Sequence, residues 1–238
     1  MTLPSVSCLC PTYGRVHALN EAVHSFLSQD YEGKKELIIL NDLSEQKIIF
    51  DHPDVKVVNV DKHIKPLGKK FNETAALASG DIYLVWEDDD IYLPHRISYS
   101  VKNMRNGLFH TGQGYFEEAP QKIIRSRNLF HANLAIHKGV FWSVNGYSLV
   151  DWSGIDTMLF EDLKRRYGEF SSDIADEDVY YIYRWSTTGY HASFWSNNNV
   201  SVIAEDYVRG KILDGSIPTG DIVLNPTWLY DYRRFLPK

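Results

Sequence analysis

The sequence of 238 residues contains only two cysteines, Cys8 and Cys10, and no long hydrophobic run. Two cysteines cannot build a disulfide framework or, by themselves, a zinc site, and we interpret both as small buried residues of a core strand. No stretch approaches the ~18 consecutive apolar residues of a membrane span, and the first residues lack the pattern of a secretory signal. We therefore expect a cytoplasmic protein without a transmembrane segment, for which peripheral membrane contact stays open.

Excess positive charge is also lacking, because 25 Lys and Arg residues face 31 Asp and Glu residues, for a net charge of −6. This balance argues against a general nucleic-acid surface, and we expect no nucleic-acid partner. Repeats, low-complexity tracts and obvious linkers are missing too, which favours a single domain over residues 1–238. Aromatic residues, by contrast, are plentiful, with 15 Tyr, 11 Phe and 6 Trp. Such side chains pack cores and also line sites that stack sugars or bases.

The first 105 residues alternate between short apolar runs and amphipathic stretches. Runs that are apolar on both faces and separated by helices predict a parallel sheet covered on both sides, with right-handed crossovers. Ligands of such sheets lie beyond the carboxyl ends of the strands. The predicted strands are 6–10 (stopped by Pro11), 37–40, 55–60 and 82–86, and the predicted helices are 16–29, 69–78 and 94–105.

The second half of the chain is less regular. Residues 107–138 are glycine-bearing and strand-like, which predicts hairpins, and the segment 227–238 mixes aromatic and basic residues. That tail could cover an active site, pair subunits or meet a lipid-linked acceptor. The other predicted elements are helices over 139–147, 153–168 and 176–190 and short strands over 191–195 and 200–204.

Three polar clusters fall at predicted strand ends, at 12–15, 41–42 and 87–90, and we expect them to meet in one crevice. The last cluster is "EDDD", whose adjacent carboxylates need a compensating cation. A divalent ion such as Mg²⁺ or Mn²⁺ is suited to such ligands and shares its coordination with substrate phosphates. Exposed acids that cap the next helix are the alternative. A calcium loop is excluded, since Leu93 and Tyr99 stand where it needs glycine and glutamate.

Four stretches, "VSCLCPTYGR", "LIILND", "GKKFNETAALASGDIYLVWEDDD" and "IYLPHRI", together resemble the family-2 glycosyltransferases. They occur in the family's order and at about its spacing. The resemblance covers residues 4–100 well and 130–165 more loosely. It implies the GT-A type of α/β fold, a single Rossmann-like domain with a mostly parallel central sheet flanked by helices. Residues 1–105 would bind the nucleotide sugar, and residues 106–238 would bind the acceptor and form a C-terminal extension.

The resemblance also implies an activity, a metal-dependent and inverting sugar transfer. The donor would be a nucleoside-diphosphate sugar, most simply a UDP-sugar, bound with Mn²⁺ or Mg²⁺. The acceptor would be a hydroxyl group, as on a glycan in polysaccharide biosynthesis. Transfer of this kind needs a Lewis acid for the leaving diphosphate, an acceptor hydroxyl held in line, and a carboxylate that accepts its proton.

Carried over to this sequence, the family's donor site begins at the end of the first strand. Pro11, Thr12, Tyr13 and Arg15 would border the nucleotide. Asp42 would accept a hydrogen bond from the base. The family's usual Asp-Asp-Gly-Ser is here Asn-Asp-Leu-Ser (41–44), which leaves the identity of the base less secure.

The same resemblance places the start of the second helix against the donor. Gly68 opens this helix, and Lys69 or Lys70 would reach the base or the diphosphate. A solvated position at the helix start is the alternative, and it is expected to hold for one of the two lysines.

In the acidic turn, Glu87 and Asp89 take the places of the two aspartates in the family's Asp-x-Asp motif. Glu87 would face the ribose or a metal-bound water, and Asp89 would ligate the metal. Asp88 lies between them, is counted with the donor-binding residues, and stays open as a second ligand.

Asp156 aligns with the family's catalytic base, although Ile155 replaces the usual glutamate before it. Asp151 is the competitor for this role, while Glu161 and Asp162 are interpreted as surface acids. A first-turn acid favoured by the helix dipole is the alternative for Asp156.

Two further side chains carry weaker predictions. Trp152 is a candidate stacking platform for an acceptor sugar or a core residue. His191 is the best-placed late histidine for a metal, although a packed or surface role is favoured.

Rival functions are a nucleotidyltransferase, a non-catalytic carbohydrate- or nucleotide-binding protein, and a retaining transferase. A nucleotidyltransferase would need a glycine-rich basic loop after the first strand, where this chain has Thr-Tyr-Gly-Arg. The sequence leaves the sugar, the acceptor and the oligomeric state open.

Overall fold

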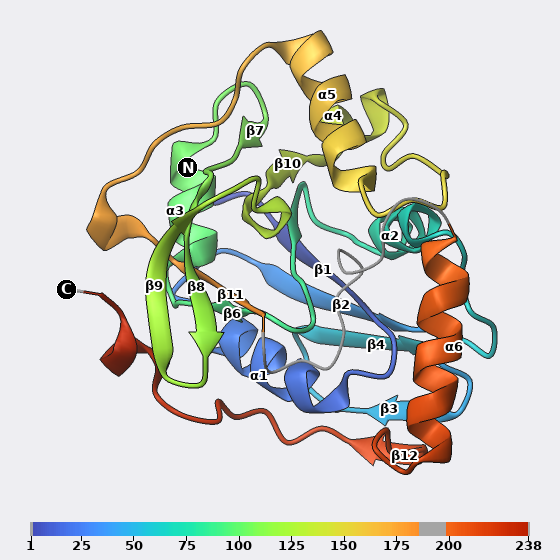
Figure 1. The fold of residues 1–238 in the computed structure, drawn as a ribbon. Helices are drawn as coiled ribbons and strands as arrows, with labels where there is room; N and C mark the ends of the chain where they lie inside the picture. The colour runs from blue at the N-terminus through green and yellow to red at the C-terminus, as the bar shows by residue number, and fades with distance from the viewer. Residues whose placement is uncertain (1, 186–198, 238) are drawn as a thin grey trace.

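Strands and helices alternate through the first half of the chain in a computed structural model that describes residues 2–185 and 199–237 (Figure 1). The strands are β1 (Val6–Thr12), β2 (Lys35–Asn41), β3 (Gln46–Ile49), β4 (Val55–Asn59), β5 (Ile82–Val85), β6 (Ile91–Tyr92), β7 (Leu108–Phe109), β8 (Gln113–Ala119), β9 (Lys122–Arg127), β10 (Ala135–His137), β11 (Tyr181–Arg184) and β12 (Gly220–Val223). The α-helices are α1 (Val16–Leu27), α2 (Leu67–Ala76), α3 (Arg96–Asn103), α4 (Lys138–Ser143), α5 (Ile155–Tyr167) and α6 (Val200–Leu213).

The largest sheet has the strand order β4-β2-β1-β5-β10-β7, in which β4, β2, β1 and β5 are parallel. β10 is antiparallel to both of its neighbours. This arrangement confirms the predicted, mostly parallel central sheet. It also brings the carboxyl ends of β1, β2 and β5 to one edge, where the three polar clusters of the sequence lie.

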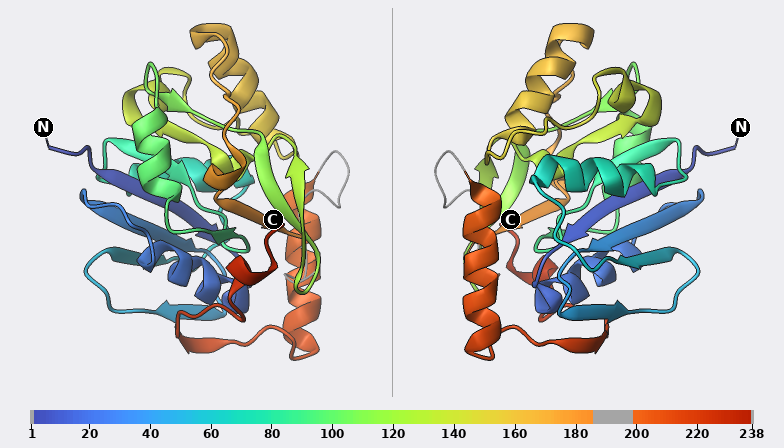
Figure 2. Two further views of the ribbon diagram at one scale, coloured as in Figure 1. Left: turned by 90° about the vertical axis from the view of Figure 1, so that its left-hand side faces the viewer. Right: turned by 90° about the vertical axis from the view of Figure 1, so that its right-hand side faces the viewer.

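Alternate residues of β1 face opposite sides of this sheet, and each side is covered by helices (Figure 2). Cys8 and Cys10 are fully buried on the side of α1, where they lie among its apolar residues. Leu9 lies in a separate cluster with Phe71 of α2 and residues of α4 and α5. Both cysteines are therefore unpaired core residues, as predicted.

The first strand is longer than predicted, because it continues through Pro11 to Thr12. The carbonyl of Leu9 accepts a hydrogen bond from Trp86 on the β5 side, and residues alternate, so Pro11 faces that side too. The pairing of β1 with β5 ends at Leu9. Pro11 lies beyond it, so its missing N–H removes no hydrogen bond between these two strands.

The prediction for the last third of the chain was partly wrong. The described part of the expected helix over 176–190, up to residue 185, is a short turn followed by β11, and residues 186–190 lie outside the described residues. β11 pairs with β6 and β8 in a second sheet of order β6-β11-β8-β9. The expected strand over 200–204 is the start of α6. The predicted strand over 191–195 lies outside the described residues. The hairpin β8–β9 and the helices α4 and α5 agree with the predictions.

The C-terminal part of the chain returns to the first half. β12 pairs in parallel with β3, a strand that was not predicted, and α6 stands beside the ends of the central strands (Figure 1). In the part of the chain that the structure describes, no helix combines the length and the apolar character needed to cross a bilayer.

Candidate functional site

The acidic turn follows β5, and its last carboxylate is built into the fold. Asp90 is buried and accepts hydrogen bonds from the Tyr181 hydroxyl, at 2.5 Å, and from the Arg184 backbone N–H, at 2.9 Å. Burial raises the pKa of Asp90 well above its ordinary value. Its role is therefore to join the turn to β11.

Asp88 and Asp89 are both paired with Arg15, which follows β1. The guanidinium of Arg15 lies 2.7 Å from Asp88 Oδ1 and 2.5 Å from Asp89 Oδ2. The turn that aims Arg15 this way has a left-handed glycine, Gly14, with φ of 74°. Burial raises the pKa of Asp88 to about 6, and the Arg15 charge acts in the opposite direction. Arg15 thus provides positive charge at a point where carboxylates are crowded.

The donor set at this turn is small. Among residues 2–185 and 199–237, no three His, Cys, Asp or Glu side chains are grouped so as to hold a metal ion by themselves. Asp88 and Asp89 are adjacent carboxylates at the sheet edge. Mg²⁺ is commonly held by one or two carboxylates together with substrate phosphates, so this pair fits an ion that is completed by its ligand.

Glu87 begins a chain of polar contacts that leads away from the turn. Its Oε1 lies 3.0 Å from His131 Nδ1, and His131 Nε2 lies 2.5 Å from the Tyr147 hydroxyl. Burial raises the pKa of Tyr147 well above its ordinary value, so its hydroxyl stays protonated and donates a hydrogen bond to His131 Nε2. The imidazole also packs edge-on against Phe71 of α2. This chain fixes the segment around 147 against the acidic turn.

His131 was not predicted as a site residue. It lies in a 3-10 turn (His131–Asn133) far along the chain from Glu87, and no spacing rule connects the two. The only signal in the sequence is a lone histidine before β10, which is too common a feature to single out.

At the end of β2, Asp42 is buried and its carboxylate is fully engaged. Its Oδ1 receives the Lys70 ammonium at 2.5 Å, and its Oδ2 accepts the Ile64 backbone N–H at 2.8 Å. Lys70 also donates to the Thr12 carbonyl, at 2.6 Å. The ends of β1 and β2 and the start of α2 therefore meet in one buried ion pair, as the crevice prediction required.

The two lysines of α2 have different surroundings. Lys69 is half-exposed and lies 3.6 Å from Glu73, whereas Lys70 reaches the crevice. Gly68 lies where α2 touches the next layer, because a Cβ at this position would be 2.0 Å from the Ser148 carbonyl oxygen. The geometry explains Gly68 by close packing, and it favours Lys70 over Lys69 as the lysine of the crevice.

Tyr13 stacks on His63, with ring centroids 4.2 Å apart and an interplanar angle of 11°. His63 is held in turn by Glu205 of α6, whose carboxylate lies 2.8 Å from His63 Nδ1 and 2.8 Å from Lys65 Nζ. A helix from the C-terminal part of the chain thus contacts the loop that follows β4.

A cavity of about 170 Å³ lies between the ends of β1 and β2 and this helix. Tyr13 and Asp42 line it from one side, and Arg209 lines it from α6. Leu43 and Val208, which belong to one small buried apolar cluster, also line it. The cavity is therefore closed by a wall that the sequence did not predict.

The two candidate catalytic bases differ in what they contact. Asp156 is in the first turn of α5, is partly exposed, and accepts a hydrogen bond from the Thr157 N–H at 2.7 Å. Its charge contributes to the raised pKa of Tyr147, so it lies on the side of the polar chain. Asp151 instead accepts hydrogen bonds from the Ser201 N–H and hydroxyl, at 3.1 and 2.7 Å, at the start of α6. Asp151 therefore connects the segment before α5 to the start of α6.

The other predicted residues lie at the margin of the site or beyond it. Trp152 is half-buried and its ring packs over Gly154. Glu161 is exposed and Asp162 pairs with Arg165, in agreement with their interpretation as surface acids. His191 lies outside the described residues.

The model of Glycosyl transferase family 2 matches residues 7–145 of this chain. An uncharacterized glycosyltransferase, YwdF of Bacillus subtilis (strain 168), is 29% identical over 108 residues, which are 44% of this chain and 40% of that protein. An N-acetylglucosaminyltransferase of Bradyrhizobium elkanii is 28% identical over 117 residues, which are 44% of this chain and 63% of that protein. The chain therefore spans less than two thirds of the length of both relatives.

Two solved structures share the fold. S. aureus TarS 1-349 in complex with UDP-GlcNAc has a TM-score of 0.61 at 15% identity, over 90% of this chain and 67% of that one. The mannosyltransferase PcManGT from Pyrobaculum calidifontis, in complex with GDP-Man and Mn²⁺, has a TM-score of 0.60 at 15% identity, over 89% and 64%. The fold of this chain is accordingly of the GT-A type.

Proposed function

This chain belongs to Glycosyl transferase family 2, and from this premise we propose that it is a metal-dependent, inverting glycosyltransferase. It moves a sugar from a nucleoside-diphosphate sugar to a hydroxyl group of a glycan. The observation that carries the proposal is the pairing of Asp88 and Asp89 with Arg15. This pairing concentrates carboxylates and a cation at the carboxyl end of a parallel sheet, where ligands of such sheets bind.

The proposed place of the donor base is the cavity of about 170 Å³ beside Tyr13 and Asp42. A uracil would take the place of His63 against the ring of Tyr13, and its N3–H would replace the Ile64 N–H at the Asp42 carboxylate. A uridine donor is proposed for this reason. The structural neighbours bind a uridine and a guanosine sugar nucleotide, so each supports a nucleotide-sugar donor and neither fixes its base.

The proposed metal is Mn²⁺ or Mg²⁺, with Asp89 as ligand and Asp88 beside it. When bound, such an ion acts as a Lewis acid for the leaving diphosphate. Arg15 adds a second positive charge at the same place. Glu87 is held by His131 through Oε1, and its other carboxylate oxygen would bind the ribose or a metal-bound water. Gly68 allows α2 to pack closely behind this site, and Lys70 rather than Lys69 supports the base pocket.

The proposed catalytic base is Asp156, which would accept the proton of the acceptor hydroxyl. Its partial exposure allows an acceptor to reach it, and its only partner among the residues that the structure describes is its neighbour Thr157. The chain Glu87–His131–Tyr147 holds the segment before α5 against the acidic turn. It thereby sets the distance between the donor and the base, on which in-line transfer depends.

We assign residues 1–105 to donor binding and residues 106–238 to acceptor binding and the C-terminal extension. Polysaccharide biosynthesis and a cytoplasmic location stay predictions from the sequence. The acceptor and the oligomeric state are open.

The test is donor binding measured by calorimetry and by thermal melting, with UDP and GDP, with and without Mn²⁺. UDP with Mn²⁺ at a hundred times its dissociation constant should stabilise the protein by ~2.7 kcal/mol. Asp89→Asn should abolish the Mn²⁺-dependent part of this gain. The matched control is Asp162→Asn on the surface of α5, which should change nothing. Absence of a response to any nucleoside diphosphate would contradict the proposal.

A further inference from the structure

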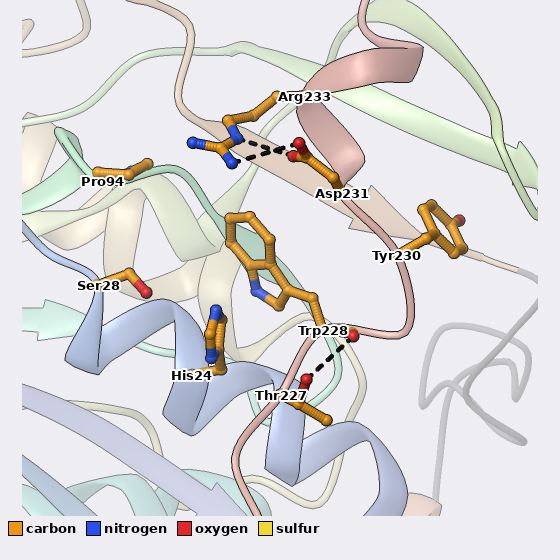
Figure 3. A pocket seen from close by; sticks show the side chains of 8 residues that line it. All are labelled: His24, Ser28, Pro94, Thr227, Trp228, Tyr230, Asp231 and Arg233. Carbon is orange, nitrogen blue, oxygen red and sulfur yellow. Dashed lines mark hydrogen bonds and ion pairs between the residues drawn. The ribbon is translucent and has the colours of Figure 1, made fainter.

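A second cavity, of about 320 Å³, lies beside the C-terminal end of α1 (Figure 3). His24 and Ser28 line it from the last turn of α1 and from the residue after it, and Trp228 and Arg233 line it from the C-terminal segment. Because an α-helix rises about 1.5 Å per residue, His24 lies about 12 Å along the axis of α1 from Val16, the first residue of the helix. None of the residues that line it belongs to the acidic turn or lines the cavity beside Tyr13 and Asp42, so the two cavities are separate.

The C-terminal segment is tied to α1 by hydrogen bonds that fix the wall of this cavity. The Leu229 N–H and the Tyr232 hydroxyl both donate to Glu21 Oε1, at 2.8 Å each. The indole N–H of Trp228 donates to Ser25 Oγ at 2.9 Å. The wall is thus formed before any ligand arrives, which lowers the conformational cost of binding.

The cavity combines an aromatic ring with a fixed pair of opposite charges. Figure 3 shows the indole of Trp228 with His24 on one side and Arg233 on the other. The ring is also held edge-on by His24 and Tyr232, at centroid distances of 5.1 and 5.7 Å. Arg233 donates two hydrogen bonds to Asp231, from Nε to Oδ1 at 2.7 Å and from Nη2 to Oδ2 at 3.3 Å. A guanidinium carries five N–H donors, so this pairing leaves donors for a ligand.

This chemistry selects a class of ligand. A free anion is disfavoured, because the Asp231 carboxylate lines the same cavity and already occupies two N–H groups of Arg233. A purely apolar ligand is disfavoured as well, because it would displace water from Asp231 and Arg233 without replacing the lost hydrogen bonds. A sugar ring meets both demands, because its C–H face packs on an indole while each hydroxyl both donates and accepts hydrogen bonds. Neighbouring hydroxyls can then donate to the Asp231 carboxylate and accept from the Arg233 guanidinium.

We propose that this cavity binds a neutral hexopyranose unit of a glycan, at a distance from the site of transfer. The site needs neither the donor nor the metal, so it can be tested independently of the proposed transferase activity. If the acceptor is a glycan, this second site holds a remote part of the same chain or a second chain.

The probes are chitotetraose, cellotetraose and maltotetraose, titrated against the full chain and observed by saturation-transfer NMR. At least one should bind the wild-type protein. Arg233→Ala removes the donor side of the pair and should raise the dissociation constant about fivefold, as expected for one hydrogen bond of about 1 kcal/mol. Its melting temperature should not change, because 61% of the Arg233 side chain is exposed.

The matched control is Arg234→Ala. Arg234 also approaches Asp231, at 3.5 Å, but it does not line the cavity. This variant should bind the probe as the wild type does, and both variants should bind UDP with unchanged affinity. Failure of all three oligosaccharides to bind the wild type, or an equal loss in both variants, would overturn the proposal.

Discussion

Asp88, Asp89 and Asp90 are adjacent in the sequence, yet they contact different groups. The first two meet the side chain of Arg15, and the third is bound by Tyr181 and by the backbone of Arg184. A run of acids in a sequence does not show which of its members the fold will use. Only the structure separates the two carboxylates at the sheet edge from the one that anchors β11.

Exchange of each candidate base for its amide separates their roles. Asp156→Asn should lower kcat by a factor of ~10²–10⁴ with unchanged donor affinity, because it removes the proton acceptor. Asp151→Asn should keep kcat and leave the free energy of unfolding nearly unchanged, because an amide oxygen can still accept both hydrogen bonds from Ser201 at the start of α6. Single-turnover transfer assays and urea unfolding measure the two effects. A larger kinetic loss in Asp151→Asn would reassign the base.

The buried side chain of His110 should make the free energy of unfolding depend on pH. Its Nε2–H donates to the Phe130 carbonyl, at 3.1 Å, and its Nδ1 accepts from the Ser171 hydroxyl, at 2.7 Å, so the neutral ring is satisfied. Burial lowers its pKa from 6.5 to about 4. As pH falls below 6.5, His110 becomes protonated in the unfolded chain but stays neutral in the folded chain. The free energy of unfolding therefore decreases. The loss between pH 7.5 and 5 should be about 2 kcal/mol.

Urea unfolding of His110→Gln at both pH values isolates this contribution. The variant cannot titrate, so its stability should fall by about 2 kcal/mol less than that of the wild type over the same interval. The control is His17→Gln, because His17 is exposed. Equal pH dependence in the wild type and in His110→Gln would show that the ring is not held neutral.

The sequence predicted the part of the site that depends on strand ends. Arg15, Asp42 and the acidic turn follow strands of one parallel sheet, and they meet because parallel strands end at a common edge. The sequence did not predict His131 or Arg184. Both reach the turn across many intervening residues, and their roles depend on how the second half of the chain packs.

At the scale of elements, the errors fall where local preference and tertiary packing disagree. Residues 176–190 start with three acids, as many helices do, but Ile182 is buried and pairs with strands on both sides. Residues 200–204 are rich in β-branched residues, yet they begin α6. Here Asp151 accepts the N–H of Ser201, and Val208 packs on Leu43. In both cases the partners come from distant parts of the chain.

The contact of α6 with the loop after β4 predicts a competition with the donor. Glu205 holds His63 on Tyr13, and the N–H of Ile64 binds the same Asp42 carboxylate that the base would use. Glu205→Gln should loosen this loop and tighten UDP binding several-fold, as measured by calorimetry. The matched control is Asp206→Asn, at an exposed position of the same helix, which should leave UDP binding unchanged.

Weaker UDP binding by Glu205→Gln would reverse this interpretation. It would mean that the loop and α6 complete the base pocket instead of competing for it. His63→Ala distinguishes the same alternatives, because it removes the ring that stacks on Tyr13 and leaves the contact of Glu205 with Lys65 in place.

At the scale of the molecule, the family match ends at residue 145, but the acidic turn is supported from beyond it. Arg184 is almost fully buried, donates to the Asp89 carbonyl at 2.5 Å, and forms an ion pair with Glu21. The hydroxyl of Tyr232 accepts from Arg184, at 3.2 Å, and donates to Glu21. The C-terminal segment is therefore connected to the proposed metal ligand through two side chains.

Tyr232→Phe tests whether this connection matters for function as well as for stability. The change leaves the buried ring and removes the hydroxyl, so Arg184 and Glu21 each lose a hydrogen bond. The free energy of unfolding should fall by about 1–3 kcal/mol. Because Arg184 also holds the backbone of Asp89, the affinity for UDP with Mn²⁺ should fall several-fold, while Arg234→Ala should change neither quantity. A loss of stability with unchanged donor affinity would mean that the C-terminal segment stabilises the fold without positioning the acidic turn.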